Sequence, residues 1–142
     1  MTPQELEITK DQYRNLEKLA GLLETVDRDK FDMRDYVVPV EGECDFFTPH
    51  EAHKSECGTV ACAAGHLAKI VKPFEGEDWD DFVDRAIGFS DLSNKWCWLF
   101  SPRWVLTDNT ALGASKRIKH LLENGVPIDW CEQMCDESPL CY

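Results

Sequence analysis

Apolar residues recur every three or four positions between Ile8 and Asp27, with polar residues between them. This spacing places the apolar side chains on one helix face and predicts an amphipathic helix. Thr9 with Gln12 three residues later predicts a capping box at the start of this helix. Comparable patterns predict further helices over Asp78–Ile87 before Gly88, over Asp91–Leu99 after Ser90, and over Thr110–Asn124 before Gly125.

The stretch from Thr59 to Val71 is rich in small side chains and predicts a helix that neighbouring elements approach closely, with Thr59 as its N-cap. An extended segment fits near residues 36–47, where Pro39 excludes a central position in a sheet. Alternating strand patterns are otherwise scarce. The sequence therefore predicts a mostly α fold, a single compact domain of residues 1–142 with about five to six helices and irregular connections.

Acidic residues outnumber basic ones by 27 to 15, which gives the 142-residue chain a formal net charge of −12. Direct binding to DNA, RNA or an anionic membrane needs patches of Lys and Arg, so the charge argues against these classes. Hydrophobic residues make up 43% of the chain, which is enough to fill a core. No apolar run approaches the length of a transmembrane helix, and the N-terminus lacks the pattern of a secretory signal. We therefore expect a cytoplasmic protein that does not enter a membrane.

The chain has seven cysteines, an odd number that fits a reducing compartment better than a disulfide framework. Cys62 and His66 are four residues apart, so they share a helix face and could bind zinc together. Either Cys57 or Cys62 could instead be a thiol nucleophile with His66 as its base. We favour a third interpretation, a small core cysteine and a hydrogen-bonded histidine, because the spacing lacks a paired Cys-x2-Cys knuckle. The candidate metal ligands are Cys57, Cys62, His66, His50 and His53.

Carboxylates concentrate in one ten-residue stretch that overlaps the helix predicted over Asp78–Ile87. On that helix Asp80, Asp81 and Asp84 are expected to face away from the apolar stripe. One interpretation is a solvated surface that confers solubility. The other is a negative surface that binds a basic partner, since carboxylates on a rigid domain can imitate the phosphates that nucleic-acid-binding proteins recognise. The candidate partner-binding residues are Glu75, Glu77, Asp78, Asp80, Asp81 and Asp84.

Two of the five tryptophans, Trp98 and Trp104, fit none of the predicted apolar stripes. We therefore expect both to be partly exposed, whereas the other tryptophans fit the core. A partly exposed tryptophan near acidic residues is a typical hot spot of a protein interface.

Two strings of the sequence are distinctive: Cys57-Gly-Thr-Val-Ala-Cys-Ala-Ala-Gly-His66, which is the more specific, and Ala86-Ile-Gly-Phe-Ser90. With them, roughly residues 13–127 resemble a family of small proteins found in bacteriophages and bacteria. The resemblance implies a cytoplasmic accessory protein of phage origin, and it supplies no catalytic residues.

Together these observations predict a non-enzymatic acidic accessory protein without a cofactor. It is expected to bind and inhibit a host protein, for instance one of host defence or one that binds nucleic acid, through its carboxylate-rich surface. The alternative is a zinc-stabilised or thiol-dependent domain, including a cysteine-dependent enzyme, that uses Cys57, Cys62 and His66. No oligomeric state is predicted.

Overall fold

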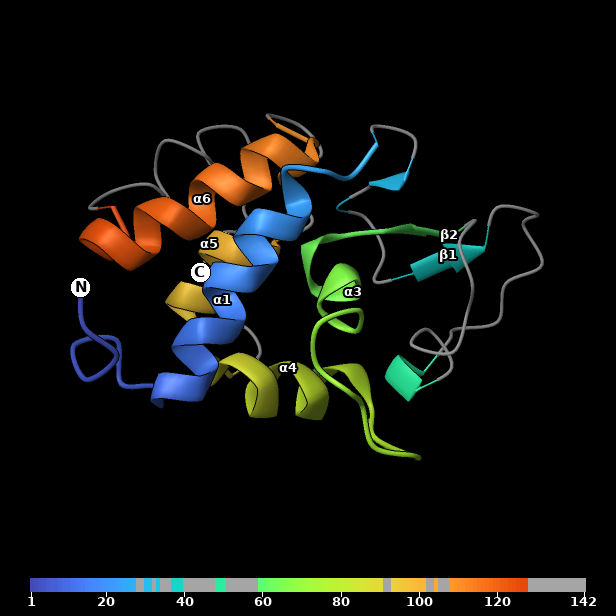
Figure 1. The fold of residues 1–142 in the computed structure, drawn as a ribbon, viewed down its shortest axis with the longest axis horizontal. Coiled ribbons are helices and arrows are strands. Elements are labelled where there is room, and N and C mark those ends of the chain that lie inside the picture. Colours follow the sequence, from blue (N-terminus) through green and yellow to red (C-terminus); the bar gives the residue numbers. More distant parts are fainter. Residues whose placement is uncertain are drawn as a thin grey trace.

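The computed structural model describes residues 1–27, 30–31, 33, 37–39, 48–50, 59–90, 93–101, 104 and 108–127. Within these residues the chain forms five α-helices and one pair of antiparallel strands (Figure 1). The mostly α prediction is therefore confirmed. No helix in this part of the chain combines the length and hydrophobicity that crossing a membrane requires. The elements in chain order are α1 (Lys10–Leu23), β1 (Val37–Pro39), β2 (Thr59–Ala61), α3 (Ala63–Leu67), α4 (Trp79–Ile87), α5 (Asn94–Phe100) and α6 (Ala111–Asn124).

Helix α1 packs against α3, α4 and α6 and runs alongside α6 (Figure 1). The predicted apolar stripe forms its buried face, since Leu16, Leu19, Ala20 and Leu23 are all buried. Ser115 of α6 is buried opposite this face, and its hydroxyl donates a hydrogen bond of 2.8 Å to the carbonyl oxygen of Ala20. The hydroxyl is thereby satisfied inside the core, as buried polar groups need to be.

The capping box predicted at the start of α1 is confirmed, and Thr110 caps α6. At α1 both halves of the capping box are present: the Gln12 N–H donates to Thr9 Oγ1 at 3.1 Å, and the Thr9 N–H donates to Gln12 Oε1 at 2.9 Å. Thr110 caps α6 in the same way by accepting from the Gly113 N–H at 3.0 Å. Such caps satisfy N–H groups that have no partner within the helix.

Helix α4 is fixed to α1 through its C-terminal carbonyl groups. The side-chain amide of Gln12 donates to the carbonyl of Arg85 at 3.2 Å, and that of Asn15 donates to the carbonyl of Ala86 at 2.8 Å. These carbonyls belong to the last turn of α4, where a helix cannot supply their partners itself. Gly88 then ends the helix with a left-handed φ of 82°. A Cβ at Gly88 would lie 2.6 Å from Gln12 Oε1, so glycine is needed for the contact as well as for the turn.

The helix predicted to begin at Thr59 in fact begins four residues later. Residues Thr59–Ala61 form β2, which pairs with β1 so that Val60 lies opposite Val38. The β-branched side chains of Thr59 and Val60 favour a strand once a partner strand is present. Helix α3 begins at Ala63, and its N-cap residue Cys62 makes no side-chain cap. β1 confirms extended backbone at residues 37–39, and the rest of the segment expected near residues 36–47 lies outside the described residues.

The N-cap predicted for helix α5 is also wrong. Ser93, not Ser90, caps α5, because its hydroxyl accepts from the Trp96 N–H at 3.2 Å. The Ser93 N–H donates to the Ser90 carbonyl at 3.0 Å, so these two serines close a hydrogen-bonded turn before the helix starts. Both serines suit an N-cap, and the turn decides between them.

Trp98 and Trp104 are partly buried, as expected, and they pack on each other with ring centroids 5.3 Å apart. The Trp98 indole N–H donates to the Arg117 carbonyl at 2.9 Å. The Arg117 side chain lies 4.1 Å from the centre of the Trp104 ring and is only 5% exposed. Burial of the guanidinium lowers the pKa of Arg117 to about 10, although nearby Asp108 opposes this effect.

We predict that Gln12→Glu lowers the free energy of unfolding by about 1–2 kcal/mol. Glutamate keeps the acceptor of the capping box but removes the amide that donates to α4, and it places a negative charge against carbonyl groups. Urea denaturation followed by circular dichroism measures the effect. Lys18→Gln on the exposed face of α1 makes the same change in net charge and should alter stability by less than about 0.5 kcal/mol.

Candidate functional site

The sequence of α4 separates an apolar face from an acidic one. Phe82, Val83, Ala86 and Ile87 are buried, whereas the side chains of Asp80, Asp81 and Asp84 are exposed. The outward orientation predicted for these three carboxylates is therefore confirmed. Asp80 and Asp81 lie in the first turn of α4, where a negative charge is favourable because the helix dipole is positive there.

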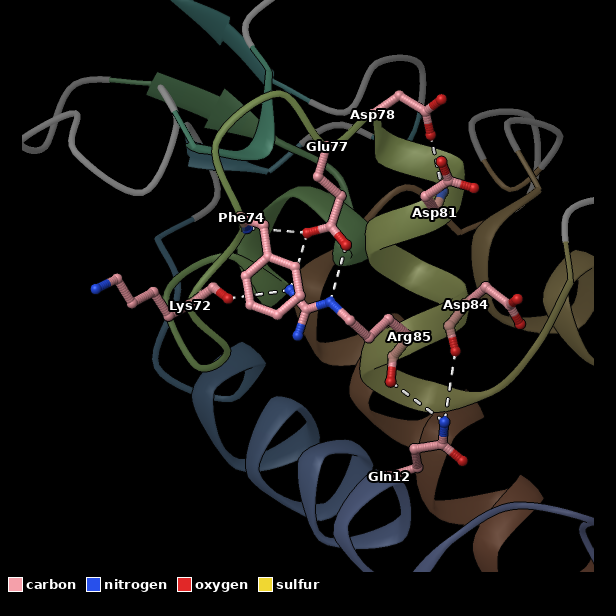
Figure 2. A network of polar contacts seen from close by, with 8 residues as sticks. All are labelled: Gln12, Lys72, Phe74, Glu77, Asp78, Asp81, Asp84 and Arg85. Atoms are coloured by element: carbon pink, nitrogen blue, oxygen red, sulfur yellow. Dashed lines mark hydrogen bonds and ion pairs between the residues drawn. The ribbon is translucent and has the colours of Figure 1, made fainter.

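Arg85 of α4 forms a two-pronged ion pair with Glu77, which precedes the helix (Figure 2). Nε of Arg85 lies 2.8 Å from Glu77 Oε2, and Nη2 lies 2.8 Å from Glu77 Oε1. The Glu77 side chain is only 9% exposed, so this pair is shielded from water more than a surface ion pair. The hydrogen bonds from Arg85 lower the pKa of Glu77, and Glu77 in turn raises the pKa of Arg85.

The same guanidinium holds the preceding turn in place. Arg85 Nη2 donates to the Lys72 carbonyl at 3.1 Å, and its Cζ lies 3.8 Å from the centre of the Phe74 ring. The turn closes through two further bonds: the Phe74 N–H donates to Glu77 Oε1 at 3.0 Å, and the Glu77 N–H donates to the Phe74 carbonyl at 3.2 Å. Gly76 supplies the positive φ of 81° that this turn needs. We call Phe74, Glu77, Arg85 and the Lys72 carbonyl the Arg85 clamp.

The six predicted partner-binding carboxylates divide into two groups in the structure. Glu77 is bound within the Arg85 clamp, and Asp78 is the N-cap of α4, accepting from the Asp81 N–H at 2.8 Å (Figure 2). These two therefore have structural roles. The other four carboxylates are exposed, and within the described residues no ion pair involves three of them: Glu75, Asp81 and Asp84.

His66, a predicted metal ligand, is fully buried in α3 and stacks on Phe31 with ring centroids 6.1 Å apart. Its Nε2 lies 2.9 Å from the Lys30 carbonyl oxygen, and its Nδ1 lies 3.1 Å from the Lys69 ammonium. A carbonyl only accepts and an ammonium only donates, so the ring is neutral with its proton on Nε2. Both nitrogens have protein partners, an arrangement that fits the favoured interpretation of a hydrogen-bonded core histidine.

The remaining candidate ligands are not brought together by the part of the chain that the structure describes. Cys62 is buried at the start of α3, and His50 is partly exposed. Cys57 and His53 lie outside the described residues. Among those that are described, no group of three or more His, Cys, Asp or Glu side chains could hold a metal ion. Zinc binding therefore stays a prediction.

Two residues of the site, Phe74 and Arg85, were not predicted from the sequence. Arg85 follows Glu77 by eight positions, which is not a spacing at which side chains meet on one helix. They meet because Glu77 lies just before the N-cap of α4, held there by its bonds to Phe74, and the long Arg85 side chain reaches back to it. A lone phenylalanine between Pro73 and Glu75 gives no pattern, although its position outside every apolar stripe was a usable signal.

No known protein family, curated protein or solved structure matches this chain. The resemblance to small phage and bacterial proteins therefore stays a prediction, and the function of the site has to be argued from its residues.

We predict that Glu77→Gln lowers the free energy of unfolding at pH 7 by about 1 kcal/mol, because it removes the charge that pairs with Arg85. The folded state depresses the pKa of Glu77 below 4.5, so the stabilisation is present above that pH and is lost as the pH falls through the lower folded value. Urea denaturation over a pH series from neutral to well below 4.5 should show wild type and variant converging in acid.

Glu75→Gln is the matched control, since it removes the same charge from an exposed side chain of the same turn. It should leave stability within about 0.5 kcal/mol of wild type. An equal loss in both variants would contradict a structural role for the Arg85 clamp.

Proposed function

We propose that this chain is a non-enzymatic cytoplasmic accessory protein that binds a basic protein surface through the outer face of α4. The observation that carries the proposal is a group of exposed carboxylates, Glu75, Asp81 and Asp84, that form no ion pair within the described part of the chain. Residues 75–84 contain no Lys or Arg, and the next cation, Arg85, is already paired with Glu77. Glu75, Asp81 and Asp84 therefore present their charge to solvent.

The chemistry of this face favours a partner that normally holds a polyanion. Complementary charge guides encounter and disfavours acidic partners. Proteins that bind nucleic acids hold phosphates with Lys and Arg, and carboxylates fixed on a rigid helix can occupy the same positions. The net charge of −12 strengthens attraction to such a surface at long range.

Inhibition of the partner follows from this form of binding. A protein that fills the phosphate-binding surface of its partner competes with the nucleic acid for it. The resemblance to small phage proteins supports a role of this kind against a host protein, including one of host defence. No reaction is part of the proposal.

We predict that Asp81→Lys/Asp84→Lys abolishes capture of the partner from a nuclease-treated bacterial lysate, with a loss of more than about tenfold. Both side chains are exposed and lie outside the Arg85 clamp, so the variant should keep its fold, which circular dichroism checks. Capture is quantified by mass spectrometry at about 50 mM and about 300 mM salt, because screening weakens contacts between exposed charges.

Glu17→Lys/Glu123→Lys makes the same change in net charge on α1 and α6, where both side chains are exposed. This control should retain the partner. If the two variants lose capture equally, binding depends on net charge rather than on α4. If neither loses it, the proposed surface is wrong.

A further inference from the structure

Phe74 is the most exposed large apolar side chain among the described residues. It is 60% exposed, compared with 54% for Leu112 and 38% for Met1. It is also the one of the three that adjoins the carboxylates of α4, since Glu75 follows it in the turn and Arg85 beneath it belongs to α4. The proposed binding surface therefore contains an aromatic ring as well as negative charge.

The ring is held in one position rather than free to collapse onto the core. The Arg85 guanidinium covers it at 3.8 Å (Figure 2) and also lies 5.7 Å from the centre of the buried Phe82 ring. Hydrogen bonds from the Phe74 N–H and to the Phe74 carbonyl fix the backbone that carries it. The ring is therefore already ordered in the free protein, so binding a partner costs little further conformational entropy.

Two exposed carboxylates, those of Glu75 and Asp81, belong to the same acidic region of the chain as the ring. Glu75 lies next to Phe74 at the exposed tip of the turn. Asp81 is four residues before Arg85, so it lies on the same face of α4, one turn away. The side chain of Lys72, the nearest cation in the sequence, extends away from Phe74 (Figure 2).

An exposed ring on an acidic surface resembles single-stranded nucleic acid more than it resembles a duplex. In a duplex the bases are stacked inside, so a protein groove for duplex DNA meets mainly phosphates and base edges. In a single strand the bases are unstacked, and proteins bind them by stacking aromatic or arginine side chains on the base while basic residues follow the backbone. Phe74 adds the stacking group that carboxylates alone lack.

We infer that Phe74 and its neighbouring carboxylates imitate a short piece of single-stranded nucleic acid, and that the partner is a protein with a basic, base-stacking groove for single strands. The Phe74 ring takes the place of a base, and the carboxylates of Glu75 and Asp81 take the place of phosphates. The inference rests on the proposed function and narrows the class of its partner.

The test uses bacterial lysate proteins separated on two resins. One fraction binds single-stranded-DNA cellulose, and the other binds only duplex-DNA cellulose. The immobilised full chain should capture protein from the first fraction, and a dT20 oligonucleotide should elute it at a lower concentration than a 20-base-pair duplex. Phe74→Ala should weaken this capture about tenfold or more, because each stacked base contributes binding of that order. Phe74→Trp should retain it. Circular dichroism should show that both variants keep the wild-type helical content at the temperature of the capture assay, although loss of the ring from Arg85 lowers the stability of Phe74→Ala.

The outcomes separate this inference from the proposed function. If Phe74→Ala binds like wild type while Asp81→Lys/Asp84→Lys does not, docking through carboxylates stands and the imitation of a single strand is wrong. Capture from the duplex fraction alone would likewise overturn the inference and leave acidic docking intact. Capture from neither fraction would overturn both.

Discussion

The structure depends on the way one side chain, Gln12, serves the ends of two helices. Its carboxamide oxygen completes the N-terminal capping box of α1, and its amide nitrogen donates to the last turn of α4. Helix ends leave backbone groups without partners, and burying them unsatisfied is costly. Because a single carboxamide satisfies both ends, the start of α1 and the end of α4 have to meet. The orientation of the acidic helix on the core follows from that meeting.

Local signals in the sequence predicted the fold wherever the deciding contacts are themselves local. The capping box at Thr9 and the apolar stripe of α1 are of this kind, because the groups involved lie within four residues. The prediction placed the start of α3 too early. Thr59 pairs with Pro39, twenty positions earlier, and the spacing of apolar residues within a helix does not reveal such a partner. Ser90 was wrongly predicted as the N-cap of α5 because serine suits both a turn and an N-cap, and the sequence does not show which of the two it forms.

The candidate site shows the same division. Exposure of Asp80, Asp81 and Asp84 follows from the helical period and was predicted. The structural roles of Glu77 and Asp78 were not predicted. The sequence alone does not distinguish the six carboxylates of this ten-residue stretch, and only the structure shows which of them contacts a cation. The roles of Arg85 and Phe74 could be recognised only once the structure showed the turn that precedes α4. Composition located the acidic segment, and geometry determined which of its members are available to a partner.

The Arg85 clamp has a consequence for how related sequences can diverge. Loss of Arg85 would leave Glu77 charged, largely shielded from water and without its partner, and loss of Glu77 would leave the guanidinium beneath Phe74 without its counter-charge. The two positions are therefore expected to change together, with Phe74 following them. Glu75, Asp81 and Asp84 are under no such coupling, and aspartate and glutamate can replace one another there as long as the charge persists. In an alignment of relatives, positions 74, 77 and 85 should therefore covary, whereas the neighbouring acidic positions should exchange aspartate and glutamate freely.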